Sequence, residues 1–200
     1  MTTHPADATS KPESDGDIRA AAIVDDGTRG SVDALLAALA ARLREGGVRV
    51  RGLLMTRPTA ERGCAATMVL VDIDTQEGYL VSQPLGRNST ACRADPQGFA
   101  RASAVLRRAA DEAPDLVIVN RFGGLEVEGG GFRAELLELM TREVPLLTSV
   151  GARHVPDWQQ FSGGATLLPA DPAAVQAWLR QVLPQRAAAA GASKRPRRVA

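Results

Sequence analysis

The fold of this chain is decided by one stretch, D-L-V-I-V-N-R-F-G-G-L-E, which runs from Asp115 to Glu126. It starts with an unbroken apolar run, which is typical of a strand buried on both faces of a parallel sheet. Because open parallel sheets bind ligands at the carboxyl ends of their strands, the polar residues after this run are predicted to point into a crevice. An ordinary strand followed by a polar turn is the alternative. The candidate ligand-binding residues here are Asn120, Arg121, Gly123, Gly124 and Glu126.

Strands and helices alternate around this central strand. Apolar runs predict strands at 19–24, 48–55, 66–73, 79–82, 145–150 and 165–168. Helical spacing predicts helices beginning near 32, 96, 132, 156 and 171, with residues 84–95 irregular. Leu136, Leu137 and Met140 are expected to share the buried face of the helix at 132–143. This pattern predicts an α/β fold with three layers and a mostly parallel sheet, in which 66–82 forms an inserted β-hairpin.

Length and charge indicate one globular domain between two polar tails. The chain has 200 residues, of which 44% are hydrophobic and 24% charged. Residues 1–17 carry a formal charge of −3 and residues 184–200 one of +5, and both segments are predicted to be disordered. The remaining domain, 18–183, is almost neutral, which argues against a nucleic-acid-binding surface. The oligomeric state is not determined by these features.

The chain contains neither an apolar leader nor a run of 18 apolar residues, so a cytoplasmic protein without a membrane span is expected. Its two cysteines, Cys64 and Cys92, form no zinc-binding pattern and are expected to be small buried side chains. Both flank the predicted hairpin, however, so a soft-metal or redox pair is the alternative. His154 has no cysteine or histidine at ligand spacing and is expected to be structural or exposed.

The loop after the first strand is a second candidate site. Helix N-terminal amides attract anions, and this loop precedes the helix that begins near residue 32. A Walker A loop would need a lysine after Gly30, which is absent, so Arg29 is the candidate replacement cation. Asp25 and Asp26 would repel an anion unless they bind a metal or point away. The candidate ligand-binding residues of the loop are Asp26, Gly27, Thr28, Arg29, Gly30 and Ser31.

Two further features have competing interpretations. Arg121 could bind an anion or form a salt bridge with Glu126 or Asp26. The run Gly129–Gly131 could be a second anion-binding nest or a flexible loop.

The strand, loop and helix, followed by L-A-A-R-L-R-E-G-G-V-R-V-R-G at 39–52, resemble the opening of small P-loop nucleoside-triphosphatases related to the thermophilic and cancer-related NTPase family. The stretch N-R-F-G-G-L-E-V from Asn120 is similar to that family's D-E-I-G-x-M-E-L signature. In this alignment the family's catalytic lysine falls at Val32, its Mg²⁺-binding threonine at Asp33, and its two Walker B acids at Asn120 and Arg121. The resemblance implies a P-loop-like scaffold with a degenerate Walker motif that lacks the groups needed for hydrolysis.

The combination of G-T-R at 27–29 with N-R-F-G-G-L-E more closely resembles the DUF2478 family, whose members are often named molybdenum-transporter-associated proteins. This resemblance suggests a role in molybdate handling.

Three hypotheses for the function follow. The domain binds a nucleotide or an oxyanion such as molybdate without hydrolysis; it is a weak Mg²⁺-dependent nucleoside-triphosphatase; or it is an adaptor that docks a protein partner in metal transport or cofactor assembly. The carboxylates that would hold Mg²⁺ under the second hypothesis are Asp25, Asp26, Asp33 and Glu126.

Overall fold

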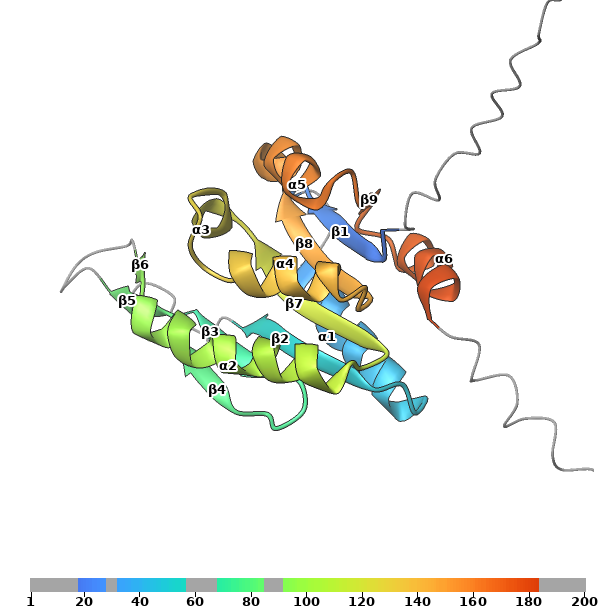
Figure 1. Ribbon diagram of the computed structural model, residues 1–200, viewed down its shortest axis with the longest axis horizontal. Helices are drawn as coiled ribbons and strands as arrows, with labels where there is room; N and C mark the ends of the chain where they lie inside the picture. Colours follow the sequence, from blue (N-terminus) through green and yellow to red (C-terminus); the bar gives the residue numbers. More distant parts are fainter. Residues whose placement is uncertain (1–17, 28–31, 57–67, 85–91, 184–200) are drawn as a thin grey trace, which may run out of the picture.

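The computed structural model describes residues 18–27, 32–56, 68–84 and 92–183, which fold around a seven-stranded sheet with the strand order β4-β3-β2-β7-β8-β1-β9 (Figure 1). The strands from β2 to β9 in this order are parallel, and β3 and β4 extend the sheet as an antiparallel hairpin. Their bounds are β1 Ala20–Asp25, β2 Val50–Thr56, β3 Val69–Asp72, β4 Gly78–Leu80, β7 Leu116–Phe122, β8 Leu146–Gly151 and β9 Thr166–Leu168.

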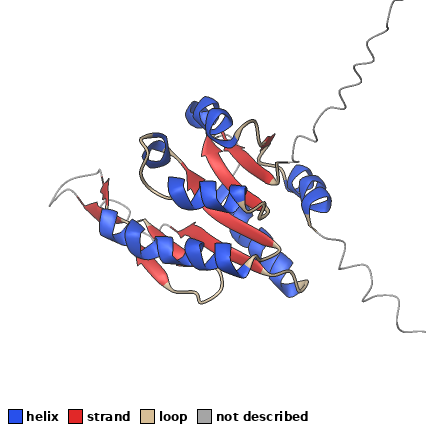
Figure 2. Cartoon of the chain, viewed as in Figure 1, coloured by secondary structure: helices blue, strands red, loops and turns tan. Residues whose placement is uncertain are grey.

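Helices cover both faces of the sheet and create two hydrophobic cores (Figure 2). Buried residues of α2, α4 and α5 belong to one core, and those of α1 and α6 to the other. The predicted α/β fold, with three layers, a mostly parallel sheet and a hairpin, is therefore confirmed. The helices are α1 Val32–Glu45, α2 Pro96–Glu112, α3 Gly124–Val127, α4 Arg133–Thr141, α5 Val155–Ser162 and α6 Pro172–Val182, with a 3₁₀ turn, η1, at Ala152–His154.

The central strand β7 pairs with β2 on one side and β8 on the other. Its apolar residues are fully buried, as predicted for a strand covered on both faces. The strand continues to Phe122, so Asn120 and Arg121 belong to it rather than to a turn. The peptide bond between these two residues is cis. The pairing of β7 with β8 is irregular between Val119 and Phe122, so Asn120 and Arg121 lie at an irregularity near the end of the strand.

The chain leaves β1 and β8 in opposite directions, and this divergence creates a crevice. After β1 it crosses through α1 on one face to reach β2, whereas after β8 it crosses through α5 on the other face to reach β9. Because β1 and β8 are neighbours, their carboxyl ends border a topological switch point. Such points are where open α/β sheets bind ligands.

Several local predictions were wrong. Leu137 is exposed at 52%, and Leu139 is buried in its place, because α4 turns its 136, 139, 140 face toward the sheet. Part of the segment predicted to be irregular forms a short antiparallel pair, β5 Ser82–Pro84 with β6 Cys92–Ala94. The four-residue helix α3 was not predicted at all.

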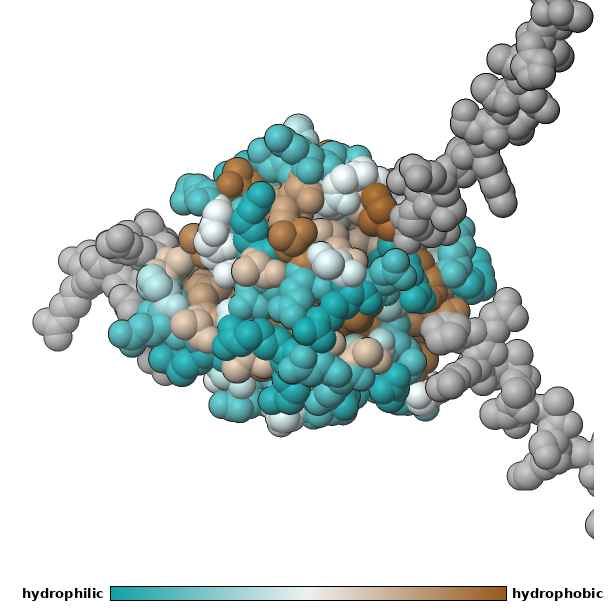
Figure 3. Space-filling model, in the orientation of Figure 1, coloured by the Kyte–Doolittle hydropathy of each residue, from teal (hydrophilic) through white to brown (hydrophobic). Residues whose placement is uncertain are grey.

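Helix ends and the outer surface follow simpler rules. Asp95 caps α2 by accepting a hydrogen bond from the Gln97 amide at 3.1 Å, and Asp171 caps α6 by accepting one from the Ala174 amide at 3.0 Å. The face covered by α2 is mainly hydrophilic, with apolar patches between the helices (Figure 3). Within the described ranges, the helices are too short or too polar to cross a membrane.

Candidate anion-binding crevice

A cavity of about 440 Å³ opens at the switch point between the carboxyl ends of β1 and β8. The end of β7 and the start of α3 form its third wall. Three of its lining residues carry basic side chains, one carries an acidic side chain, and four are glycines whose backbone is accessible. The lining residues are Asp25, Gly27, Arg121, Phe122, Gly123, Gly124, Gly151, Ala152, Arg153 and His154.

Arg121 enters this crevice from β7 and is oriented by two acids. Its guanidinium nitrogens lie 3.8 Å from Asp25 Oδ2 and 3.7 Å from Asp33 Oδ1, both longer than an ordinary hydrogen bond. The Arg121 side chain is 29% exposed. Among the described residues its guanidinium donates no hydrogen bond of ordinary length, so its N–H groups can reach a ligand. Under the alternative interpretation, Arg121 would form a salt bridge with Glu126 or Asp26, but its ionic partners are Asp25 and Asp33.

Asn120 lies behind Arg121 and is completely buried. Its amide accepts a hydrogen bond from Ser149 Oγ at 2.6 Å and donates one to Asp33 Oδ1 at 2.7 Å. These bonds tie β7 to β8 and to the first turn of α1. Asn120 therefore does not point into the crevice, contrary to the prediction, and instead fixes the acid that orients Arg121.

Glu126 was also predicted to point into the crevice, and that prediction is wrong. Its carboxylate is only 3% exposed and turns back onto the loop, where it accepts hydrogen bonds from the amides of Gly123 at 2.9 Å and Phe132 at 3.0 Å. Burial raises the pKa of Glu126 above its ordinary value, and the hydrogen bonds from the two amides partly oppose this shift. Glu126 thus organises the loop after β7 from inside.

The glycine run after α3 completes this loop. Gly131 has a φ of +56°, and a Cβ built there would lie 2.0 Å from Glu126 Oε1. The loop therefore binds the carboxylate of Glu126. Under the nest interpretation of Gly129–Gly131, an external anion would find no room beside Gly131.

Two further basic residues of the lining follow β8. Arg153 and His154 lie in η1, and Arg153 Nε donates to His154 Nε2 at 3.0 Å. His154 Nδ1 lies 3.2 Å from Asp157 Oδ2. Arg153 was not predicted as a site residue, and His154 was expected to be structural or exposed. The rule that selected Asn120 and Arg121, polar residues at the carboxyl end of a buried strand, would have selected both when applied to β8.

The remaining predicted residues are placed as follows. Gly27, Gly123 and Gly124 line the crevice, and Asp26 is exposed at its edge. Thr28, Arg29, Gly30, Ser31 and Cys64 lie outside the described residues, as does the side chain of Cys92 in β6, so the predicted cysteine pair is not tested. In the part of the chain that is described, no group of three histidine, cysteine, aspartate or glutamate residues could hold a metal ion.

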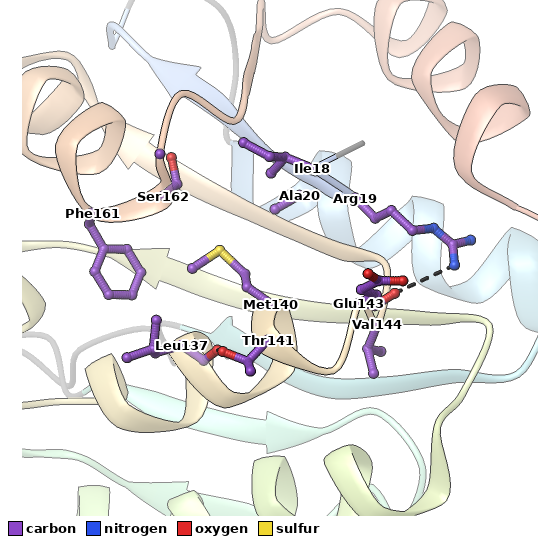
Figure 4. A pocket seen from close by; sticks show the side chains of 11 residues that line it. Ile18, Arg19, Ala20, Leu137, Met140, Thr141, Glu143, Val144, Phe161 and Ser162 are labelled. Carbon is purple, nitrogen blue, oxygen red and sulfur yellow. Dashed lines mark hydrogen bonds between the residues drawn. The ribbon is translucent and has the colours of Figure 1, made fainter. Parts of the chain in front are cut away.

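Another cavity lies at the opposite edge of the sheet, where β1 and β8 begin (Figure 4). Its walls are largely apolar, from Ile18, Leu137, Met140 and Phe161. The one arginine in its lining, Arg19, donates to the backbone carbonyls of Glu143 at 3.4 Å and of Val182. This cavity therefore lacks the available cationic groups that distinguish the crevice at the carboxyl edge.

Residues 20–178, which include every residue of the crevice, match the family described as a protein of unknown function, DUF2478. The chain belongs to the DUF2478 family. It is also similar to the "Molybdenum import ATP-binding protein ModC 2" of Bradyrhizobium diazoefficiens, with 33% identity over 150 residues. The match covers 74% of this chain but only 17% of that relative, so the chain corresponds to a small part of a much longer protein.

Proposed function

We propose that this domain binds a small anion in the crevice between β1 and β8 and does not hydrolyse it. The candidate ligands are an oxyanion such as molybdate and the phosphoryl group of a nucleotide. The observation that carries the proposal is that two arginines, Arg121 and Arg153, line one cavity at the switch point of the sheet.

The charge of the crevice supports this proposal. Of the charged side chains that line it, Arg121 and Arg153 outnumber Asp25, so the lining carries a formal charge of +1 with His154 neutral. One oxygen of Asp25 accepts a hydrogen bond from the Gly27 amide at 3.1 Å, and the other faces Arg121. A guanidinium presents planar pairs of N–H donors that match the oxygens of a phosphate or another tetrahedral oxyanion.

The positions aligned with the Walker B acids favour binding without hydrolysis. Asn120 cannot hold Mg²⁺ as a carboxylate would, and Arg121 cannot accept a proton from attacking water. The carboxylate of Asp33 lies beside both positions: it accepts a hydrogen bond from Asn120 and faces Arg121. We expect no phosphate release from ATP with Mg²⁺ above the blank, for the unaltered chain and for Asp33→Asn alike. Turnover that Asp33→Asn abolishes would support the nucleoside-triphosphatase hypothesis instead.

The relative supports an extension of this proposal to a role in molybdenum uptake or homeostasis. The name of that relative concerns molybdenum import, and the similarity extends over 74% of this chain. Molybdate is therefore the first oxyanion to test, and a protein partner in metal transport is part of the same proposal.

Calorimetry with molybdate, tungstate, sulfate, ATP and GTP tests the binding. Arg121→Ala should weaken the binding of the ligand by at least about tenfold, or roughly 1.4 kcal/mol, and Arg121→Glu should weaken it further. Arg142→Ala is the matched control, because Arg142 forms surface ion pairs with Asp111 and Glu138 away from the crevice. Heats equal to buffer for all five anions, or equal affinities in both Arg121 variants with unchanged melting temperature, would contradict the proposal.

A further inference from the structure

The hydrogen bonds of His154 define which of its nitrogens carries the proton. Arg153 Nε donates to His154 Nε2 at 3.0 Å, and a guanidinium can only donate. Nε2 therefore accepts and carries no proton in this arrangement. The ring proton lies on Nδ1, which donates to Asp157 Oδ2 at 3.2 Å. The contact with Arg153 therefore uses Nε2 of His154 as an acceptor.

Protonation of His154 would reverse this arrangement. With a proton on Nε2 the ring can no longer accept from Arg153, and two cations would stand 3.0 Å apart. On the other side of the ring, Asp157 would form an ion pair with the imidazolium. Among the described residues, the other charged groups near the ring are Glu126 of α3, whose pKa a charged His154 would lower, and Arg121 and Asp25, which line the same cavity. An anion between Arg153 and His154 would remove the repulsion between them.

We propose that an anion entering the crevice is bound together with one proton, which His154 takes from water at Nε2. The imidazole then changes from an acceptor for Arg153 into a donor to the ligand, and Arg153 Nε is released to donate to the same ligand. This inference rests on the proposed anion-binding function and extends it. Because His154 and Arg153 would both donate to the ligand, the ligand class is an anion with at least two acceptor oxygens on one central atom.

The consequence is that anion affinity depends on pH. Histidine side chains change charge between about pH 5 and 8. Where His154 is neutral in the free protein and charged in the complex, uptake of one proton makes binding about tenfold tighter for each unit by which the pH falls. The dependence disappears once the pH is low enough to protonate His154 in the free protein.

Calorimetry of the full chain in two buffers with different ionisation enthalpies measures the proton uptake directly. The probes are molybdate and ATP, titrated near pH 7, with sulfate as an anion whose own charge is constant in this range. For molybdate and sulfate we expect uptake of up to about one proton per bound anion, and no difference between buffers for His154→Gln. For ATP, whose terminal phosphate also titrates near pH 7, we expect the uptake to exceed that of His154→Gln by up to about one proton. Glutamine is the matched variant because its amide oxygen can accept from Arg153 but cannot take up a proton. The molybdate and ATP arms separate a free oxyanion from a nucleotide phosphoryl group.

Nitrogen NMR of the imidazole rings tests the starting state. The chain has only two histidines, and the spectrum of His154→Gln assigns the signals of His4. At the basic end of the range, the free protein should show His154 with its proton on Nδ1, and saturation with molybdate near pH 7 should produce an imidazolium signal. A proton on Nε2 in the free protein, or a neutral ring in the complex, would overturn the inference.

The two proposals fail in different ways. Heats that are the same in both buffers, with clear binding, would overturn the proton uptake and leave the anion site intact. An absence of binding by every anion tested would overturn both, because no ligand would then be present to draw the proton to His154.

Discussion

Ser149 Oγ donates to Asn120 Oδ1 across 2.6 Å, between two neighbouring strands of the sheet, and thereby fixes which end of the buried amide faces Asp33. The amide NH₂ group is directed to Asp33 Oδ1 at 2.7 Å. Asp33 in turn faces Arg121. An uncharged residue in the sheet thus determines the position of the cation that lines the crevice.

Replacing this amide by an acid, which the nucleoside-triphosphatases that the sequence resembles have at the aligned position, should destabilise the protein. In Asn120→Asp, a fully buried carboxylate would face Asp33 without a proton between them. Uncompensated buried charge typically costs about 3 kcal/mol, so we expect a loss of that order in the free energy of unfolding near pH 7. Urea denaturation measures it.

A second substitution provides the control. Adding Asp33→Asn to Asn120→Asp restores one donor opposite one acceptor and should recover most of the lost stability. Equal stability of Asn120→Asp and the unaltered chain, or no recovery in the double variant, would mean that the contact between residues 33 and 120 does not govern this region.

Glu126 should make stability fall as the pH rises. Because burial raises its pKa in the folded state, the folded protein binds more protons than the unfolded chain between the ordinary glutamate value of 4.5 and the raised value. The stabilisation is therefore fully present below pH 4.5 and is lost as the pH rises through the raised pKa. The difference in free energy of unfolding between the unaltered chain and Glu126→Gln should decline across this window.

Urea denaturation of both proteins at several values between about pH 4 and 8 gives that difference. Glutamine offers one acceptor to two amides, so Glu126→Gln should also lose about 1 to 3 kcal/mol at every pH. A difference that grows with pH would indicate a lowered pKa and contradict the prediction.

Gly131→Ala should destabilise the loop after α3 more than Gly129→Ala does. Both glycines have positive φ, +56° and +91°, but only at Gly131 would a methyl group collide with the Glu126 carboxylate. Overpacking of this kind typically costs about 1 to 3 kcal/mol, which is the expected difference between the two variants in urea denaturation. In a Glu126→Ala background the difference should shrink, because the colliding atoms are gone. Equal losses in both backgrounds would assign the effect to backbone strain alone.

The sequence predicted the layers well because they depend on local apolar patterns. The strand at 116–119 and the helix that begins at Pro96 follow directly from such patterns. The orientation of side chains at the crevice could not be predicted in the same way. Asn120 faces partners 29 and 87 residues away, and Glu126 faces amides that approach it only when the glycine loop closes. These are tertiary contacts that leave no periodic signal.

The hydrogen bond from Arg19 to the Val182 carbonyl joins the residue before β1 to the last residue of α6. The two ends of the described domain, near Ile18 and Leu183, therefore lie on the same side of the molecule (Figure 1). A domain whose ends are adjacent can be inserted into a loop of another protein without stretching either polypeptide. The adjacent ends therefore suit a domain that occurs as one part of longer proteins, and the relative that it resembles over 17% of its length is such a longer protein.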